Sequence, residues 1–256
     1  MPATNLFDLT GRVAMVTGAS RGIGASIART LAAYGAHVVV SSRKQEACEE
    51  VVTAIRAGGG QATAMACHIG ELAQIESIMA AVEARHGRLD VLVNNAATNP
   101  HYGPITELPA DAFQKTVDVN IRGYFYMSSA GVKLMARGGG GSIINVASVN
   151  GVIPGPLQGV YSITKAAVIA MTKAFARECA PQGVRVNALL PGLTDTKFAA
   201  ALTKNPAVLK FALAHVPMNR VAQPDEMAGA VLYLASAASS YTTGVALNVD
   251  GGYLVA

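Results

Sequence analysis

Cysteine is scarce in this chain, and the few cysteines present do not form a recognisable set. They are Cys48, Cys67 and Cys179. Their number is odd, and their wide spacing fits neither a disulfide framework nor a metal-ligand motif. We therefore expect no structural disulfide, no metal site and a reducing, cytoplasmic environment.

Charge is also sparse, since charged residues make up 14% of the chain and hydrophobic residues 51%. This proportion excludes a disordered chain and indicates a large buried core. The formal net charge is +4, but no more than two basic residues follow one another. A nucleic-acid partner usually requires a clustered basic face, so the small excess favours anionic small molecules instead.

Long apolar runs are missing as well. No run reaches the roughly 20 residues that cross a bilayer. The first residues lack the basic and apolar regions of a signal peptide, and the last residues form no recognised sorting tail. These features predict a soluble cytoplasmic protein without a membrane partner.

What the chain does contain is a regular alternation of short apolar runs and helical patterns. The runs predict strands at residues 12–17, 37–41, 62–67, 91–94, 142–147, 185–190 and 245–249, and the helical patterns lie at 22–34, 44–57, 71–86, 111–137, 160–181 and 224–236. Several runs are apolar throughout, as in parallel strands covered on both faces. We predict an α/β fold of the Rossmann type: a doubly wound, seven-stranded parallel sheet with helices on both faces, forming a single domain over 1–256.

One segment, residues 192–222, interrupts this alternation near the expected ligand end of the sheet. Insertions at that position often serve as lids. Apolar side chains of this segment, with those of residues 150–159, predict a largely apolar substrate pocket. The lid residues concerned are Phe198, Leu202, Leu209 and Phe211.

A glycine-rich turn follows the first predicted strand and opens directly into a helix. Its three glycines allow a tight turn, close approach of a pyrophosphate and close packing of helix on strand. The helix start offers free N–H groups to phosphate. A turn without a ligand is the alternative, but the strand before and the helix after favour a dinucleotide site. Its residues are Gly18, Ser20, Arg21, Gly22, Ile23 and Gly24.

The end of the second predicted strand bears on the choice of cofactor. An NAD site usually has an acidic residue there, which binds the ribose 2′-hydroxyl. Residues 41–44 contain no acid and instead offer Ser42 and Arg43, with Arg21 nearby in the glycine turn. A guanidinium group fits a 2′-phosphate. NADP(H) is therefore favoured and NAD(H) is the alternative; a third reading is that Arg43 and Lys44 only form a solvated helix start.

Tyr161 and Lys165 stand four residues apart in a helical pattern, so they share one face. An ammonium about 4 Å from a phenol is expected to lower the phenol pKa from about 10 by two to three units. Such a pair exchanges protons near neutral pH. The alternative is an ordinary surface pair.

Taken in order along the chain, these features resemble the short-chain dehydrogenase/reductase family in its single-domain subtype. The resemblance runs from Gly11 to Gly252, and the run Ser41-Ser-Arg-Lys44 resembles the NADPH-dependent carbonyl reductase branch. Further matching pieces are Asn94-Asn95-Ala96-Ala97, Asn120, Ser148, Tyr161 with Lys165, and Pro191-Gly192.

The resemblance implies a catalytic set of four residues. Tyr161 would exchange the proton with the substrate oxygen, and Ser148 would hydrogen-bond that oxygen. Lys165 would lower the pKa of Tyr161 and hold the nicotinamide ribose. Asn120 would hold a water that connects Lys165 with solvent.

The resemblance also implies further cofactor contacts. Asn95 and Ala96 would lie along the ribose, and Thr194 and Thr196, after Pro191 and Gly192, would contact the carboxamide and the diphosphate. Two positions depart from the family pattern. His68 replaces an aspartate that binds adenine, which leaves stacking by His68 or a backbone contact of Ile69, and Ala97 replaces a glycine.

The function that follows is interconversion of a ketone or aldehyde and a secondary alcohol by an NADP(H)-dependent oxidoreductase. One alternative is a 3-oxoacyl reductase of fatty-acid synthesis, although only Arg137 and Arg177 remain near the positions where such enzymes present basic residues to an acyl carrier protein. Another is a non-catalytic nucleotide sensor. The resemblance further implies a homotetramer, paired through helices 111–137 and 160–181 and through the tail 250–256.

Overall fold

All strands of the described residues belong to one parallel sheet. The computed structural model describes residues 5–199, 203 and 206–255; the lid residue Leu202 lies outside them. The sheet order is β3-β2-β1-β4-β5-β6-β7. The strands are β1 (Val13–Thr17), β2 (His37–Ser42), β3 (Gln61–Ala66), β4 (Val91–Asn94), β5 (Gly141–Val146), β6 (Val184–Pro191) and β7 (Ala246–Val249). Each begins and ends within one residue of its prediction.

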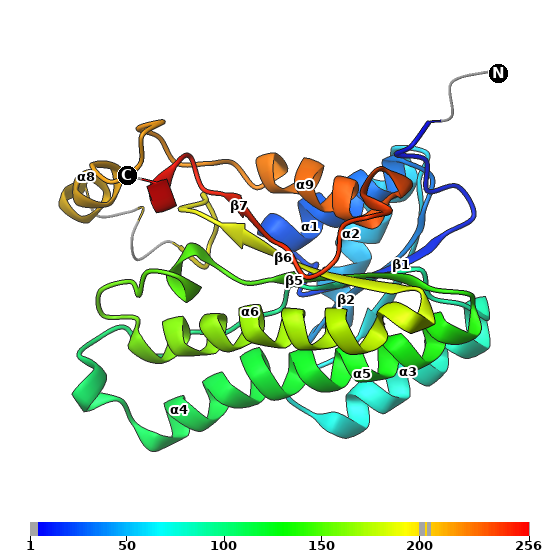
Figure 1. The fold of residues 1–256 in the computed structure, drawn as a ribbon, viewed down its shortest axis with the longest axis horizontal. Helices are drawn as coiled ribbons and strands as arrows, with labels where there is room; N and C mark the ends of the chain where they lie inside the picture. The colour runs from blue at the N-terminus through cyan, green and yellow to red at the C-terminus, as the bar shows by residue number, and fades with distance from the viewer. Residues whose placement is uncertain (1–4, 200–202, 204–205, 256) are drawn as a thin grey trace.

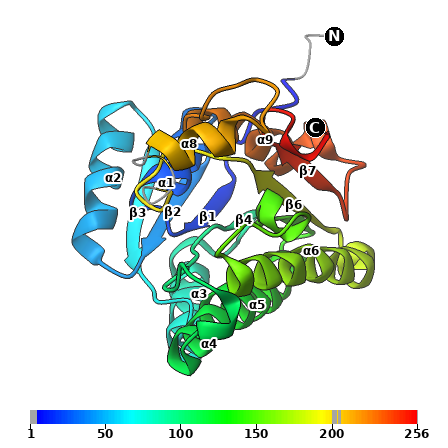
Figure 2. The ribbon, with the colours of Figure 1, turned by 90° about the vertical axis from the view of Figure 1, so that its left-hand side faces the viewer.

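Helices cover both faces of the sheet, which confirms the doubly wound α/β fold (Figures 1 and 2). One face carries α1 (Gly22–Ala33), α2 (Gln45–Ala57) and α9 (Asp225–Ala235); the other carries α3 (Leu72–His86), α5 (Gly123–Arg137) and α6 (Gly159–Cys179). Shorter helices are α4 (Ala110–Val117) and α8 (Pro206–Leu213). One-turn helices lie at Ile105–Glu107, Val149–Gly151, Ala180–Gln182, Ala237–Ser239 and Tyr253–Val255.

The strand β1 shows why its residues form a central strand. Its five side chains are all buried. Ala14 and Val16 contribute to the core under α1 and α9, while Val13 and Met15 contribute to the core under α3 and α5. A strand whose two faces are both covered has no need of polar alternation.

The predicted helix 111–137 is interrupted. Between α4 and α5 the chain makes a π-helical turn over Asp118–Arg122. A π turn adds one residue to a helical turn, and such insertions are frequent at functional sites. The apolar periodicity is too coarse to register one added residue, so the sequence predicted an unbroken helix here.

The amino ends of the central strands are joined by a buried carboxylate. Asp90, just before β4, accepts hydrogen bonds from the Arg12 and Arg88 guanidinium groups and from the Val13 N–H. Burial raises the pKa of Asp90, but the bonds from Arg88, Val13 and Arg12 outweigh it, so the pKa lies below its usual value. Within the described part of the chain, no helix is both long and apolar enough to cross a membrane.

Candidate active site

The sheet order reverses between β1 and β4, and the predicted site residues gather at the carboxyl ends of these and the neighbouring strands. β1 continues into α1 on one side, while β4 leads toward α4 on the other. Open parallel sheets bind ligands in the crevice at such a switch point. In Figure 1 the arrow of β6 points to this end of the molecule, where α8 also lies.

The glycine turn after β1 leaves no room for larger side chains. Gly18 and Gly22 have φ values of +63° and +54°, which glycine adopts without strain. A Cβ on Gly18 would lie 2.7 Å from the Ala96 Cα, and one on Gly24 would lie 2.5 Å from the Gly18 carbonyl oxygen. The turn therefore keeps backbone N–H groups at the start of α1 open, and this cradle fits the pyrophosphate of a dinucleotide.

The loop after β4 is tied to this turn through Thr17, a residue that the sequence analysis did not single out. The Thr17 hydroxyl accepts hydrogen bonds from the backbone N–H groups of Asn95 (2.9 Å) and Ala96 (3.2 Å). The Asn95 amide donates in return to the carbonyl oxygens of Thr17 (2.9 Å) and Gly18 (3.1 Å). The Asn95 side chain thus braces the glycine turn, while contact of Asn95 and Ala96 with a ribose stays a prediction.

The positively charged side chains expected near a 2′-phosphate are open to solvent. Arg21 at the start of α1 and Arg43 after β2 are exposed, while Ser20 and Ser42 are half-buried. Among the described residues, neither arginine forms an ion pair with a carboxylate. Both guanidinium groups are therefore available to an anion.

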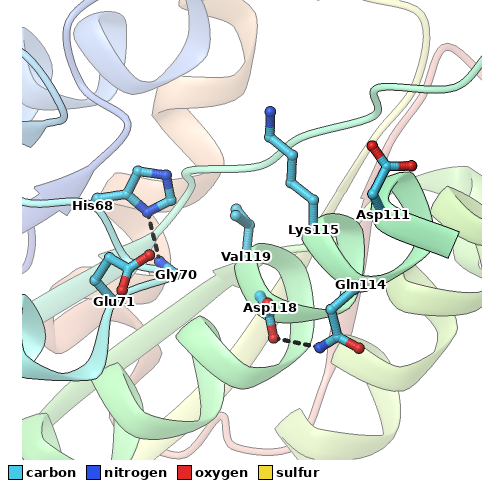
Figure 3. A pocket seen from close by; sticks show the side chains of 8 residues that line it. All are labelled: His68, Gly70, Glu71, Asp111, Gln114, Lys115, Asp118 and Val119. Atoms are coloured by element: carbon cyan, nitrogen blue, oxygen red, sulfur yellow. Dashed lines mark hydrogen bonds between the residues drawn. The ribbon is translucent and has the colours of Figure 1, made fainter.

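The loop after β3 places His68 beside a cavity of about 380 Å³ (Figure 3). The opposite wall is α4 and the π turn. His68 Nδ1 accepts a hydrogen bond from the Gly70 N–H at 3.0 Å, so the neutral ring carries its proton on Nε2. Ile69 is buried, and a Cβ on Gly123 would meet its carbonyl oxygen at 2.5 Å. The cavity is lined by His68, Gly70, Glu71, Asp111, Gln114, Lys115, Asp118 and Val119.

Tyr161 and Lys165 lie on α6 and are both buried, with 8% and 1% of their surface exposed. The Lys165 Nζ is 5.6 Å from the centre of the Tyr161 ring, and it donates a hydrogen bond to the Val146 carbonyl oxygen at 2.6 Å. Ser148 lies two residues beyond Val146, and its hydroxyl lies close enough to Tyr161 to lower the pKa of that phenol. The structure therefore brings these three predicted residues together.

The pKa of Tyr161 differs from the sequence-based expectation. Burial raises it to about 12, and the nearby Ser148 hydroxyl lowers it only in part. Burial also lowers the pKa of Lys165 to about 7. The expected lowering of the tyrosine pKa was wrong for the protein alone, because desolvation penalises the charged form of each group and outweighs their attraction.

Asn120 lies in the π turn and is fully buried. Its amide donates to the carbonyl oxygen of Thr98 (2.9 Å) and to the hydroxyl of Thr164 (3.1 Å), and its Oδ1 accepts from the Thr98 N–H (2.9 Å). Thr164 in turn donates to the Tyr161 carbonyl oxygen. Asn120 thus connects the loop after β4 to α6, while its predicted water relay to Lys165 stays a prediction.

The segment after β6 reaches back over the glycine turn. Pro191 ends the strand, and a Cβ on Gly22 would lie 3.2 Å from the Thr196 Cγ2. Thr194 is 4% exposed, and its hydroxyl donates to the Gly192 carbonyl oxygen at 3.1 Å, so this side chain braces its own loop. Contact of Thr194 and Thr196 with a cofactor stays a prediction.

Comparison with known proteins identifies the family. A family model described as enoyl-(acyl carrier protein) reductase matches residues 18–254. Dehydrogenase/reductase SDR family member 4 of Bos taurus is 40% identical over 246 residues, which cover 96% of this chain and 88% of that protein. The chain is a short-chain dehydrogenase/reductase. It is therefore an oxidoreductase that acts on CH–OH groups, and this sets aside the non-catalytic sensor.

Two further similarities are to proteins with more specific names. The 3-oxoacyl-[acyl-carrier-protein] reductase of a Synechocystis strain is 39% identical, covering 96% of this chain and 98% of that protein. A gluconate 5-dehydrogenase from Burkholderia cenocepacia, solved in complex with NADP and tartrate, is 35% identical with a TM-score of 0.95, covering 98% of both chains.

Proposed function

We propose that this short-chain dehydrogenase/reductase uses NADP(H) to interconvert a ketone or aldehyde and a secondary alcohol. The observation that carries the proposal is the buried pair of Tyr161 and Lys165, with the half-buried Ser148 beside it, at the carboxyl end of the sheet. The cofactor supplies the hydride, and the protein must supply orientation and a proton.

The protonation states favour the direction of carbonyl reduction. With a pKa of about 12, Tyr161 carries its proton at neutral pH. A neutral phenol is a suitable donor to an oxygen that gains negative charge, and the Ser148 hydroxyl stabilises the same charge. A protonated Lys165 nearby favours the phenolate that remains after the proton has left. Oxidation of an alcohol would instead require Tyr161 to begin ionised.

The choice of NADP(H) rests on Arg21 and Arg43, which are exposed and have no carboxylate partner in the described chain. The gluconate 5-dehydrogenase of similar structure was solved with NADP, which supports the same choice. NAD(H) is the alternative cofactor.

A substitution of Arg43 tests this choice. We expect Arg43→Asp to lower kcat/KM for NADPH about tenfold or more and to raise the preference for NADH, because a carboxylate repels the 2′-phosphate. Lys44→Asp is the matched control, because it makes the same charge change at the next, equally exposed position. Equal effects of the two variants would contradict a specific role for Arg43.

A second candidate function is reduction of 3-oxoacyl thioesters. The observation that favours it is the similarity to the Synechocystis 3-oxoacyl reductase and to the enoyl reductase family model. Of the two basic residues considered for carrier docking, Arg137 forms an ion pair with Glu83 at 2.5 Å, which makes it less available to an acidic carrier protein. A panel of simple ketones, diketones, 5-ketogluconate and 3-oxoacyl thioesters, assayed with both cofactors, separates the candidates.

The segment 192–222 is proposed to act as the substrate lid. Its Phe198 ring lies 5.6 Å, centre to centre, from the ring of Tyr161, and more than half of its surface is exposed. An aromatic side chain at this position supports an apolar wall beside the reacting carbonyl. The outward-facing Phe211 of α8 makes no such contact with Tyr161 in the described chain.

We further propose a cytoplasmic homotetramer with the single-domain organisation predicted above. All three cysteines are free and buried, which suits a reducing compartment. Large apolar side chains are exposed on the helices predicted to pair with other subunits, and such patches often mark interfaces. They are Phe113 of α4, Phe125 and Tyr126 of α5, and Ile163 of α6.

A further inference from the structure

We propose that Tyr124 is a positioning residue for Lys165, which it holds against the carbonyl oxygen of Val146. The proposal rests on the proposed function, in which Lys165 acts beside Tyr161. Tyr124 lies in the second position of α5, four residues after Asn120, and it is completely buried.

One carbonyl oxygen connects the two side chains. The Tyr124 hydroxyl donates to the Val146 oxygen at 3.2 Å, and the Lys165 Nζ donates to the same oxygen at 2.6 Å. Val146 ends β5, two residues before Ser148. The end of β5, the helices α5 and α6 and the loop that carries Ser148 therefore meet near this one acceptor.

The ring of Tyr124 also bounds the ammonium group. The Lys165 Nζ lies 5.2 Å from the centre of the Tyr124 ring and 5.6 Å from the centre of the Tyr161 ring. Both distances are within the range in which an aromatic ring stabilises a cation. The lysine head group thus has a carbonyl dipole and two aromatic rings as neighbours.

No negatively charged side chain of the described residues stabilises the Lys165 ammonium instead. The titratable groups that face Lys165 are Tyr161 from its own helix and Tyr124 from α5, and burial keeps the pKa of each above its ordinary value. Within the described residues no carboxylate forms an ion pair with Lys165. The buried ammonium is therefore stabilised by the Val146 carbonyl dipole and by two aromatic rings. Tyr124 supplies one of the rings, and its hydroxyl shares the carbonyl oxygen with Lys165.

The ring and the hydroxyl of Tyr124 should shift the pKa of Lys165 in opposite directions, so two variants give a test. Tyr124→Leu removes the ring together with the hydroxyl, and we expect loss of the ring to outweigh loss of the hydroxyl, so that Lys165 loses its proton at lower pH. The alkaline limb of the kcat/KM profile for ketone reduction should then shift to lower pH by roughly one unit. Tyr124→Phe keeps the ring and leaves the Val146 oxygen to Lys165 alone, so the limb should move to higher pH. Tyr241→Leu is the control and should leave the limb in place, because Tyr241 is fully exposed and lies outside α4, α5 and α6.

A second readout does not depend on turnover. Unfolding free energy is measured against pH, without cofactor, for proteins with and without Lys165→Met. The difference between the two is compared in the wild-type and Tyr124→Leu backgrounds. The rise of this difference with pH should begin roughly one unit lower in the Tyr124→Leu background. The proposal would be overturned if the alkaline limb of kcat/KM stayed at the wild-type pH in both Tyr124 variants and the stability difference began to rise at the wild-type pH in Tyr124→Leu. A fall in thermal stability alone would not rescue it. Absence of any ketone reduction by the wild-type enzyme would instead refute the proposed function.

Discussion

Tyr161 and Lys165 show how burial sets the chemistry of single residues. The sequence correctly predicted that the two share a helix face, because a spacing of four residues fixes that geometry. It could not predict their burial, which depends on how α5, α6 and the end of β5 pack together. Burial reversed the expected direction of the tyrosine pKa and lowered the lysine pKa to about 7.

The lowered lysine pKa makes stability depend on pH. Between pH 7 and 9.5 the unfolded state keeps the Lys165 proton, because its pKa there is near 10.5, while the folded state has released it. The free energy of unfolding therefore rises with pH, by up to about 1.4 kcal/mol per unit. Lys165→Met should remove this contribution. Urea unfolding of both proteins at several pH values measures it, and equal slopes would contradict the account.

At the scale of elements, apolar patterns predicted the strands closely and the glycine turn predicted the start of α1. Three features escaped prediction, for different reasons. The hydroxyl of Thr17 acts only once the loop after β4 lies beside it. The π turn adds one residue that periodicity does not register, and α8 lies in the segment 192–222, for which no helix was predicted.

The glycine turn yields a prediction in which strain and clash are separated. Gly18→Ala combines a left-handed backbone with a Cβ placed 2.7 Å from Ala96, whereas Gly59→Ala has a similar φ of +82° and nothing within 4 Å. Gly59→Ala should cost about 1–2 kcal/mol of stability and leave cofactor affinity unchanged. Gly18→Ala should cost more and weaken NADPH binding at least tenfold. Urea unfolding and fluorescence titration measure both effects, and similar results for the two variants would refute the close-approach argument.

At the scale of the whole molecule, the two ends of the sheet differ in their tasks. The carboxyl ends bring together the loops after β1, β4, β5 and β6, which carry the residues that the family resemblance implied. The amino ends carry the Asp90 cluster instead, in which Asp90 and Arg88 meet Arg12 and Val13 from a distant part of the sequence. That cluster could not be predicted, because Arg12 and Asp90 become neighbours only when β1 pairs with β4.

The exposed aromatic face of α5 tests the proposed assembly. If α5 pairs with another subunit, Phe125→Arg places a charge in an apolar contact, and the sedimenting mass should fall from a multiple of 26.3 kDa toward a smaller species. Tyr241→Arg is the control, because Tyr241 is fully exposed and lies outside α4, α5 and α6. A wild-type protein that sediments as a single chain would contradict the assembly.

The central claim is that Tyr161 passes the proton while the cofactor site stands independently of it. The direct measurement is ketone-dependent oxidation of NADPH by Tyr161→Phe, alongside NADPH binding followed by fluorescence, with Tyr241→Phe at a fully exposed position as the control. The account predicts that Tyr161→Phe binds NADPH within about threefold of wild type and loses at least about 10³-fold in kcat, while Tyr241→Phe keeps both. Turnover by Tyr161→Phe within tenfold of wild type would contradict it.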